Sequence, residues 1–370
     1  MVEFLDLKAI TASFGGRIEK AVEDVVASGR YLQGPRVESF EREYARFIGA
    51  GHCVGCGNGL DALSLIYRAW IEMGLLEPGD EVIIPANTYI ASVLAVSENG
   101  LVPVLVDPDP DTLQLDPDRF EAALSPRTRS LLLVHLYGRC AWSERIGEIC
   151  RERGLLVVED NAQAHGCRYL NRLTGAFSHA AGHSFYPGKN LGALGDAGAV
   201  TTNDSRLAEM VRSLGNYGSS RKYIFPYAGR NSRLDEIQAA VLSVKLPRLL
   251  QDNEARCAVA ARYYDEIRNP LVRLPRRAPA GENVYHLFPV FCDDRDRLEK
   301  HLDEAGIRTL VHYPVPPHLQ ECYRGKNIIR CSGNLLLTER LAATELSLPI
   351  SPVMSDSDVS EVIEAVNSFR

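Results

Sequence analysis

The sequence has no long hydrophobic run and no excess of basic residues. A membrane-spanning helix needs about 20 consecutive apolar residues, whereas the longest candidate, Leu131 to Leu136, is interrupted by His135. The first residues include acids and no hydrophobic signal core. Lys and Arg number 41 against 48 Asp and Glu, a net charge of −7. These absences argue against a membrane protein and against a protein that binds nucleic acid or anionic lipid.

Cysteine is present without a disulfide or metal pattern. The nine cysteines form an odd, scattered set, which indicates reduced thiols in the cytoplasm rather than a disulfide framework. Cys53 and Cys56 make one C-x-x-C pair, but no second pair follows at zinc-ribbon spacing. We therefore interpret this pair as two small residues of a strand and predict no metal site.

The remaining composition is that of a soluble globular protein. The 370 residues are 45% hydrophobic and 24% charged, which suffices for a large core and argues against disorder. From residue 50 to 205, aliphatic runs alternate with helical segments at Asp61–Trp70, Pro117–Leu124 and Trp142–Arg153. The predicted strands are His52–Gly55, Glu81–Ile84, Val102–Val106, Ser130–Leu136, Leu155–Val158, Ala181–Phe185 and Gly198–Thr202. This alternation predicts an α/β fold with a mostly parallel, seven-stranded sheet flanked by helices.

The pattern changes after about residue 233. Two long helices are expected at Leu234–Leu246 and Leu250–Ile267, with a break near Pro247. The remaining chain mixes strands and helices, which are expected at Val284–Phe291, Arg308–His312, Arg295–Ala305 and Asp358–Phe369. We predict a large domain of residues 1–250 and a smaller C-terminal α+β domain of residues 251–370.

Three glycine-rich segments depart from the usual nucleotide-binding templates. Gly55–Leu60 has Leu60 in place of the third Rossmann glycine. In Gly182–Asn190 five residues separate the glycines and Asn follows the Lys, whereas a Walker A loop has four and then Ser or Thr. Gly192–Gly198 precedes a strand instead of a helix. The sequence supports neither dinucleotide nor P-loop binding.

A different phosphate chemistry fits the first of these segments. Gly57-Asn58-Gly59 lies between a predicted strand and an amphipathic helix, where backbone N–H groups and the helix dipole attract a phosphate. A simple N-cap by Asn58, with Asp61 in the first turn, explains the same residues equally well.

Lys189 and Asp160 form the most informative pair. Lys189 follows the strand that ends near Phe185, and loops at strand ends of parallel sheets bind ligands. A partly desolvated lysine there has a lowered pKa and forms Schiff bases, although a lone lysine is ordinarily a solvated surface residue. Asp160 ends the preceding strand and is suited to hold a pyridinium nitrogen protonated. A phosphate loop, a strand-end acid and a loop lysine together indicate pyridoxal 5'-phosphate (PLP).

Motifs along nearly the whole chain resemble the DegT/DnrJ/EryC1/StrS family of nucleotide-sugar aminotransferases, which are fold-type I PLP enzymes. The stretches that support the resemblance are Gly29–Pro35, Gly57–Leu63, Pro85–Ala91, Glu159–Gly166, His183–Gly192, Gly229–Gln238 and His312–Gln320. The lysine segment is specific in combination with the other blocks, whereas the glycine turns alone are not.

The resemblance implies a role for each of several residues around the cofactor ring. Lys189 would form the Schiff base and then move the proton between substrate and cofactor. Asp160 would pair with the pyridinium nitrogen, Gln163 would contact the O3′ side, and Tyr89 would stack on the ring. Core packing of Tyr89 and a loop hydrogen bond of Gln163 remain alternative readings.

The resemblance also implies how the phosphate is held. Gly57 and Asn58, through their backbone, and Ser184 would bind it, and Asn231 would reach it from a partner subunit. The expected assembly is therefore a homodimer with shared active sites. Many family members have Thr where this chain has Asn58, so a hydroxyl contact to the phosphate is missing here. The presence of Lys189 argues against the family's dehydratases, in which His replaces the lysine.

The predicted reaction moves an amino group from L-glutamate to a nucleotide-linked keto-sugar. The Gly57 and Pro85 blocks resemble enzymes that act at C3 of dTDP-3-oxo-6-deoxyhexoses; C4 amination of a UDP- or GDP-4-keto sugar is the alternative. The expected sugar-nucleotide contacts are Tyr31, Gln33, His312, Tyr313 and His318, although the histidines could equally be structural.

Other classes stay open at this point. Amino-acid transamination or cysteine desulfuration would share Asp160 and Lys189, although no cysteine is obviously placed in a long mobile loop as a desulfurase requires. A regulatory protein that binds PLP without catalysing a reaction is the non-enzymatic alternative. The intact Lys189, Asp160 and Gln163 argue against it.

Overall fold

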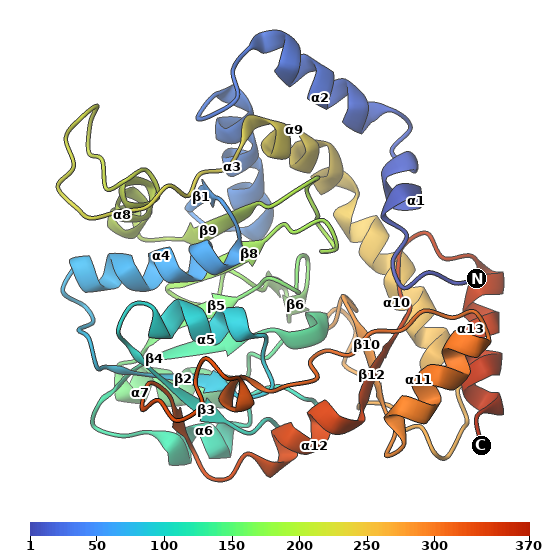
Figure 1. Ribbon diagram of the computed structural model, residues 1–370. Coiled ribbons are helices and arrows are strands. Elements are labelled where there is room, and N and C mark those ends of the chain that lie inside the picture. The colour runs from blue at the N-terminus through green and yellow to red at the C-terminus, as the bar shows by residue number, and fades with distance from the viewer.

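A large twisted sheet forms the centre of the molecule (Figure 1). The computed structural model describes residues 1–370, and the strand order of its sheet is β1-β9-β8-β5-β4-β2-β3-β11. Only β9 runs opposite to the other strands. The strands are β1 (His52–Cys56), β2 (Glu81–Pro85), β3 (Val102–Val106), β4 (Thr128–Val134), β5 (Leu156–Asp160), β8 (Ala180–Ser184), β9 (Gly198–Thr202) and β11 (Arg330–Cys331). The prediction of a mostly parallel sheet flanked by helices is confirmed.

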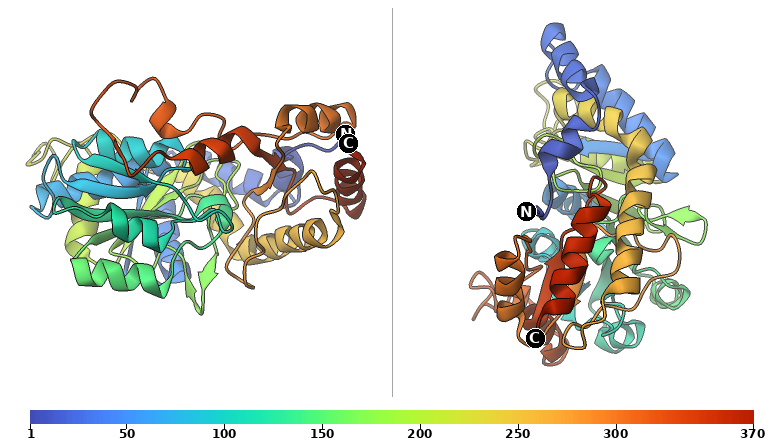
Figure 2. Two further views of the ribbon diagram at one scale, coloured as in Figure 1. Left: turned by 90° about the horizontal axis from the view of Figure 1, so that it is seen from below. Right: turned by 90° about the vertical axis from the view of Figure 1, so that its right-hand side faces the viewer.

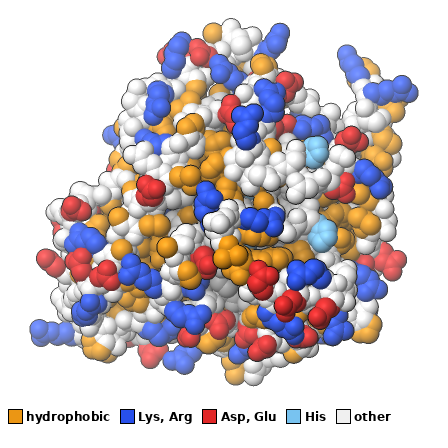
Figure 3. Space-filling model, turned by 180° about the vertical axis from the view of Figure 1, so that it is seen from behind, with side chains coloured by type: hydrophobic (Ala, Val, Ile, Leu, Met, Phe, Trp, Pro, Cys, Tyr) orange, Lys and Arg blue, Asp and Glu red, His pale blue; other side chains and the backbone are white.

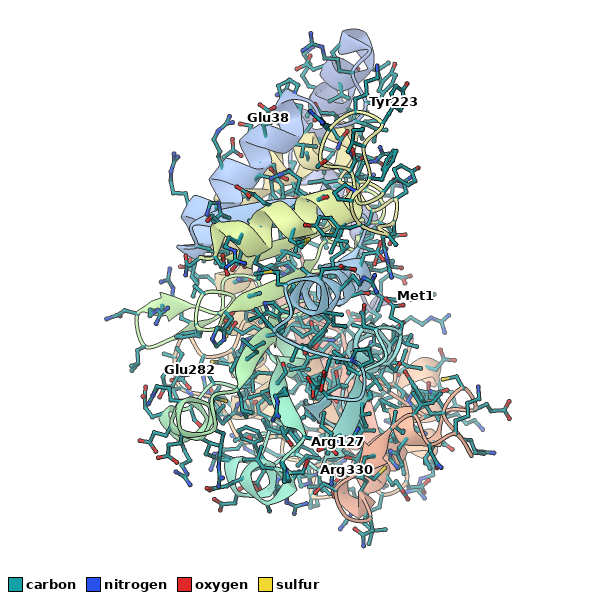
Figure 4. All side chains as sticks on the ribbon, turned by 90° about the vertical axis from the view of Figure 1, so that its left-hand side faces the viewer. Met1, Glu38, Arg127, Tyr223, Glu282 and Arg330 are labelled. Atoms are coloured by element: carbon teal, nitrogen blue, oxygen red, sulfur yellow. The ribbon has the colours of Figure 1, made fainter.

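The predicted number of seven strands is too low by one, because β11 comes from the C-terminal part of the chain. It pairs in parallel with β3, and Arg330 forms an ion pair of 3.1 Å with Glu81 of β2. Figure 4 shows Arg330 beside Arg127 at this edge of the sheet. A two-residue strand has no periodicity of its own, so only its tertiary partners reveal it.

Alternate residues of the central strands point into two different cores. Val82 and Ile84 of β2 belong to the core that contains α4 and α5. Ile83, between them, belongs to the core that contains α6 and α7. Because both faces are covered, these strands are apolar throughout instead of alternating with polar residues.

Thirteen α-helices surround the sheet. Their bounds are α1 (Leu7–Ala12), α2 (Arg17–Ser28), α3 (Pro35–Ile48), α4 (Gly59–Glu72), α5 (Ile90–Ser97), α6 (Pro117–Ala123), α7 (Glu144–Arg153), α8 (Ser205–Gly215), α9 (Glu236–Lys245), α10 (Leu249–Glu266), α11 (Arg295–Glu304), α12 (Leu336–Thr344) and α13 (Asp356–Ser368). The N-terminal helices α1 to α3 were not predicted, although α3 is amphipathic. None of the helices combines the length and apolar character needed to cross a membrane.

The C-terminal part has its own small core around an antiparallel pair of strands. β10 (Phe288–Phe291) pairs with β12 (Glu345–Leu348), and α10, α11 and α13 pack around them (Figure 2). The strand predicted at Arg308–His312 is wrong, since this segment makes only one bridge, from Leu310 to Ser347. Its extension into a ladder is prevented because the His312 N–H donates to the Glu345 carboxylate instead, at 2.6 Å.

Segments from either side of residue 250 cross the predicted division. Val2 lies in the C-terminal core and bridges to Ile307, while β11 belongs to the large sheet. Both termini lie at the C-terminal part of the molecule, with the N-terminus above the C-terminus in Figure 1. The boundary at residue 250 stays a prediction.

Two short strands, β6 (Arg168–Tyr169) and β7 (Arg172–Leu173), form a hairpin outside the large sheet. The segment from 216 to 231 projects from the body beside α8 (Figure 1). On the face seen in Figure 3, Lys and Arg are interspersed with Asp and Glu.

Candidate active site

A cavity of about 760 Å³ lies at the carboxyl ends of the parallel strands, where open α/β sheets bind their ligands. Eight of the predicted site residues line it, namely Asn58, Tyr89, Asp160, Gln163, Ser184, Lys189, His312 and Tyr313. They come from segments that lie far apart in the sequence. The fold therefore brings together the lysine, the strand-end acid and the start of α4.

Lys189 is held in a tight loop after β8. Its backbone N–H donates to the Tyr186 carbonyl at 2.8 Å. Gly192 closes the loop, because a Cβ atom there would lie 2.3 Å from the Pro187 carbonyl oxygen. Burial lowers the pKa of the Lys189 amine to about 8, against the opposing pull of the Asp160 carboxylate. The lysine is thus a half-buried amine in the cavity lining rather than a solvated surface residue.

The Asp160 carboxylate is buried at the end of β5 and held at both oxygens. Oδ2 accepts a hydrogen bond from the Ser92 hydroxyl at 2.8 Å, and Oδ1 accepts one from the Ala162 N–H at 3.1 Å. The Ser92 hydroxyl is in turn 2.8 Å from that of Thr88. Burial raises the pKa of Asp160, while the two hydrogen bonds and Lys189 act in the opposite direction.

The acid next to Asp160 has a different task. Glu159 lies 2.9 Å from the buried His135 ring and accepts hydrogen bonds from the loop of residues 175–178. The cavity lining includes Asp160 and His135 but not Glu159. Successive residues of a strand point to opposite faces, so Asp160 alone is free for a ligand.

Gln163 and two tyrosines form one wall of the cavity. The Gln163 amide donates to the Tyr313 hydroxyl at 2.9 Å and accepts from the Tyr137 N–H. The rings of Tyr313 and Tyr89 lie 5.0 Å apart. Tyr89 is 52% exposed, which rules out the alternative that it is a core residue. The Gln163 side chain does make hydrogen bonds within the protein, as its alternative reading required.

The start of α4 has features of both predicted roles of the Gly57-Asn58-Gly59 turn, the helix N-cap and the phosphate site. The Asn58 side chain caps the helix by accepting from the Asp61 N–H at 2.9 Å. Gly59 and Leu60 line the cavity at the first turn, where helical N–H groups have no partner within the helix. Gly59 is required here, because a Cβ would lie 2.5 Å from that of Ser184.

Gly57 differs from Asn58 and Gly59 in its contacts. Its N–H donates to the Ser232 hydroxyl at 3.0 Å, and the residue lies outside the cavity lining. The phosphate contact predicted for Gly57 stays a prediction.

The Tyr31 and Gln33 loop also lies outside this cavity. Both residues are exposed, and the buried Glu236 carboxylate fixes the loop by accepting from the N–H groups of Gly34, Arg36 and Val37. Three donors to one carboxylate explain why an acid is buried at this position.

Asn231 and His318 are the other predicted residues outside the cavity. Asn231 is exposed on the projecting segment, where it bridges to Asn216. The His318 ring lies 3.1 Å from the Glu339 carboxylate of α12. The substrate role predicted for His318 stays a prediction, and its contact is a structural one.

Several residues of the site had no role in the sequence interpretation. Ser92, Ser232, Glu236 and His286 all contact or flank predicted residues. Ser92 immediately follows the Pro85 block, so proximity to a motif was the only available signal. Ser232 and Glu236 lie within the Gly229–Gln238 block, but their partners are up to 202 residues away, and no sequence pattern encodes such a pairing.

A model of the DegT/DnrJ/EryC1/StrS aminotransferase family matches residues 13–367. The chain belongs to this family. It is 47% identical over 369 residues to a dTDP-3-amino-3,6-dideoxy-alpha-D-galactopyranose transaminase of Aneurinibacillus thermoaerophilus, and the match covers 100% of this chain and 99% of that relative. It is 48% identical over 369 residues to a dTDP-3-amino-3,4,6-trideoxy-alpha-D-glucose transaminase of Streptomyces venezuelae, with 100% and 96% covered.

A solved structure of the same family has the same fold. The crystal structure of S. venezuelae DesV matches with a TM-score of 0.94 at 48% identity, over 99% of this chain and 97% of that one. The motif-based resemblance is thus confirmed, and the chain is an aminotransferase of a PLP-dependent family.

The cavity offers chemistry that matches PLP at three places. Lys189 offers a half-buried primary amine, Asp160 a buried carboxylate, and the first turn of α4 unpaired N–H groups beside the Ser184 hydroxyl. These suit the aldehyde, the pyridine nitrogen and the phosphate in turn.

Proposed function

We propose that this protein transfers an amino group from L-glutamate to C3 of a dTDP-3-oxo-6-deoxyhexose, giving a dTDP-3-amino-3,6-dideoxyhexose. The observation that supports it most is the half-buried Lys189 amine, with a lowered pKa, in one cavity with Asp160. The two relatives described above are named as dTDP-3-amino-sugar transaminases, which favours C3 over the alternative, C4 amination of a UDP- or GDP-4-keto sugar.

In this mechanism Lys189 binds the cofactor and then moves the proton. PLP, when bound, acts as an electron sink for the bond that is broken at the substrate carbon. The freed Nζ atom takes the proton from the glutamate carbon in the first half-reaction and returns one to the sugar carbon in the second. One amine serves as base and acid most efficiently when its pKa lies near neutrality, and burial shifts Lys189 in that direction.

The other residues of the site would hold and orient the cofactor. Asp160, an anion fixed by Ser92 and Ala162, would keep the pyridine nitrogen protonated. Tyr89, with half of its surface free, would cover the ring, and Gln163 would contact its O3′ side. Ser184 and the first turn of α4 would bind the phosphate.

The pKa of Lys189 predicts how the apoprotein captures PLP at different pH. Only the free amine attacks an aldehyde, and with a pKa of about 8 the amine is mostly charged below that pH and mostly free above it. The capture rate, followed by stopped-flow absorbance, is expected to rise with pH to a plateau with its midpoint near 8. Nα-acetyl-lysine in solution is the control, and a protein midpoint near the ordinary lysine value of 10.5 would contradict the prediction.

The function itself is tested with the purified protein and PLP in two steps. L-glutamate is expected to bleach the visible absorption band of the bound cofactor, and a dTDP-3-oxo-6-deoxyhexose is expected to restore it with release of the amino sugar. A competition between 3-oxo and 4-keto sugar nucleotides follows. Preference for the 4-keto sugar would overturn the C3 assignment, and a band that ignores glutamate would overturn the donor.

We further propose that the active sites are shared within a homodimer. Asn231 and the Tyr31 loop are exposed and lie outside this chain's cavity, as expected for residues that serve a partner's site. Figure 4 shows Tyr223 on the projecting segment. This segment exposes a group of large apolar side chains, Tyr217, Tyr223, Ile224 and Phe225. A surface of this kind is typical of a protein contact.

The nine free cysteines support a location in the reducing cytoplasm.

A further inference from the structure

His286 is a polar side chain of the cavity that the mechanism above does not use. His286 lines the cavity together with Lys189. Its Nδ1 atom lies 3.1 Å from the Asn190 Oδ1 atom, whereas Nε2 makes no hydrogen bond within the protein. A half-buried imidazole with one paired and one open nitrogen presents a single polar atom to whatever fills the cavity.

The proton position on this ring follows from the network around Asn190. The Asn190 amide nitrogen donates to the Val284 carbonyl at 3.1 Å and to the Asn253 side-chain oxygen at 2.8 Å. A backbone carbonyl can only accept, so the orientation of the amide is settled. Asn253 is oriented in the same way, because its own amide nitrogen donates to the His165 carbonyl at 2.8 Å.

The oxygen of Asn190 therefore faces His286. An amide oxygen can only accept, so the proton of the neutral imidazole must be on Nδ1, and Nε2 carries a lone pair. The ring is neutral, because burial and the nearby Lys189 cation lower the pKa of His286 well below its ordinary value. Nε2 is thus an unpaired hydrogen-bond acceptor on a residue that lines the cavity.

An acceptor at this place selects among the groups of the proposed substrates. Carboxylates and phosphates offer only acceptor oxygens and would be repelled by the lone pair. The hydroxyls of a hexose are donors, and the hexose is the part of the nucleotide sugar that must approach Lys189. Thymine also has an N–H donor, but it lies at the opposite end of the ligand.

We infer that His286 is a sugar-binding residue, whose Nε2 atom accepts a hydrogen bond from a hydroxyl of the hexose beside the reacting carbon. The inference rests on the proposed function for the identity of the ligand. The sugar half-reaction then has a contact that the glutamate carboxylates cannot make. The hydrogen bonds of Asn190 and Asn253 have the role of fixing the tautomer of His286.

The test compares two ligands on the PLP-loaded protein by calorimetry. The probes are dTDP-glucose, a stable dTDP-hexose, and dTDP, which has no hexose. His286→Phe is expected to lower the affinity for dTDP-glucose roughly 3- to 10-fold, which corresponds to the loss of one neutral hydrogen bond. The affinity for dTDP is expected to stay unchanged. His286→Gln, which keeps an acceptor oxygen, is expected to retain most of the affinity.

The outcomes separate this inference from the proposed function. If His286→Phe lowers the affinity for both ligands equally, or for neither, the role of His286 is overturned while the dTDP-sugar assignment stays intact. Failure of the unaltered protein to bind either probe would overturn both. Nitrogen-15 NMR of the histidine rings checks the tautomer directly, and a His286 proton found on Nε2 would also overturn the inference.

Discussion

Lys189→Ala is expected to abolish turnover while the protein still binds some PLP. The variant lacks the only amine that the cavity places near Asp160, and loss of a general acid–base group alone costs up to about 10⁴-fold. Asp160, Ser184 and the first turn of α4 remain to hold the cofactor non-covalently. Transamination from glutamate to the keto-sugar measures the first effect, and equilibrium dialysis of PLP measures the second.

Lys189→Arg is the matched control for charge. The guanidinium keeps the positive charge opposite Asp160 but does not deprotonate in a protein, so this variant is expected to be as inactive as the alanine variant. Circular dichroism establishes that both variants are folded. Turnover comparable to that of the unaltered protein in either variant would show that Lys189 is not the catalytic amine.

Asp160→Asn is expected to give the second-largest loss, about 10²- to 10³-fold in turnover, the usual cost of removing one preorganised electrostatic partner. An amide is nearly the same size as the carboxylate, so the cavity keeps its shape. The neutral side chain would no longer favour the protonated pyridine nitrogen, and the affinity for PLP should fall as well. Steady-state rates and PLP titration measure the two effects.

Ser92 provides graded variants of the same site. Ser92→Ala leaves the anion but removes its 2.8 Å hydrogen bond, so a smaller loss in the same direction is expected, roughly the 1.5 to 3 kcal/mol of a hydrogen bond to a charged group. Ser92→Thr keeps the hydroxyl and is expected to restore PLP affinity. An alanine variant that binds PLP as tightly as the unaltered protein would contradict the proposed support of Asp160.

Much of the catalytic centre was predictable because its residues stand at strand ends. Asp160 closes an apolar run and Lys189 follows another, and parallel strands bring their carboxyl ends to one edge. The pattern of apolar runs alone thus implies that two residues 29 positions apart in the chain meet at that edge. Tyr89 and Ser184 were named from the family resemblance, and the structure places them after β2 and at the end of β8, at the same edge.

The long-range contacts around the centre were not predictable. Glu236 fixes the Gly34 loop across 202 residues, and Ser232 occupies the Gly57 N–H across 175. Each is a single side chain placed by the packing of separate elements, and no periodicity distinguishes it from its neighbours. For the same reason the short strand β11 and the interrupted segment 308–312 differ from the prediction.

The sequence by itself determined the sheet, the family motifs and the identity of the amine and the acid, because hydrophobic periodicity and strand ends are local properties. The tertiary structure decided which polar groups are paired within the protein and which face the cavity. It paired Gly57 with Ser232 and His318 with Glu339, and it left Lys189, Asp160 and His286 open to the cavity. Pairing and burial depend on elements far apart in the chain, and they set the pKa and hydrogen-bonding capacity from which the chemistry follows.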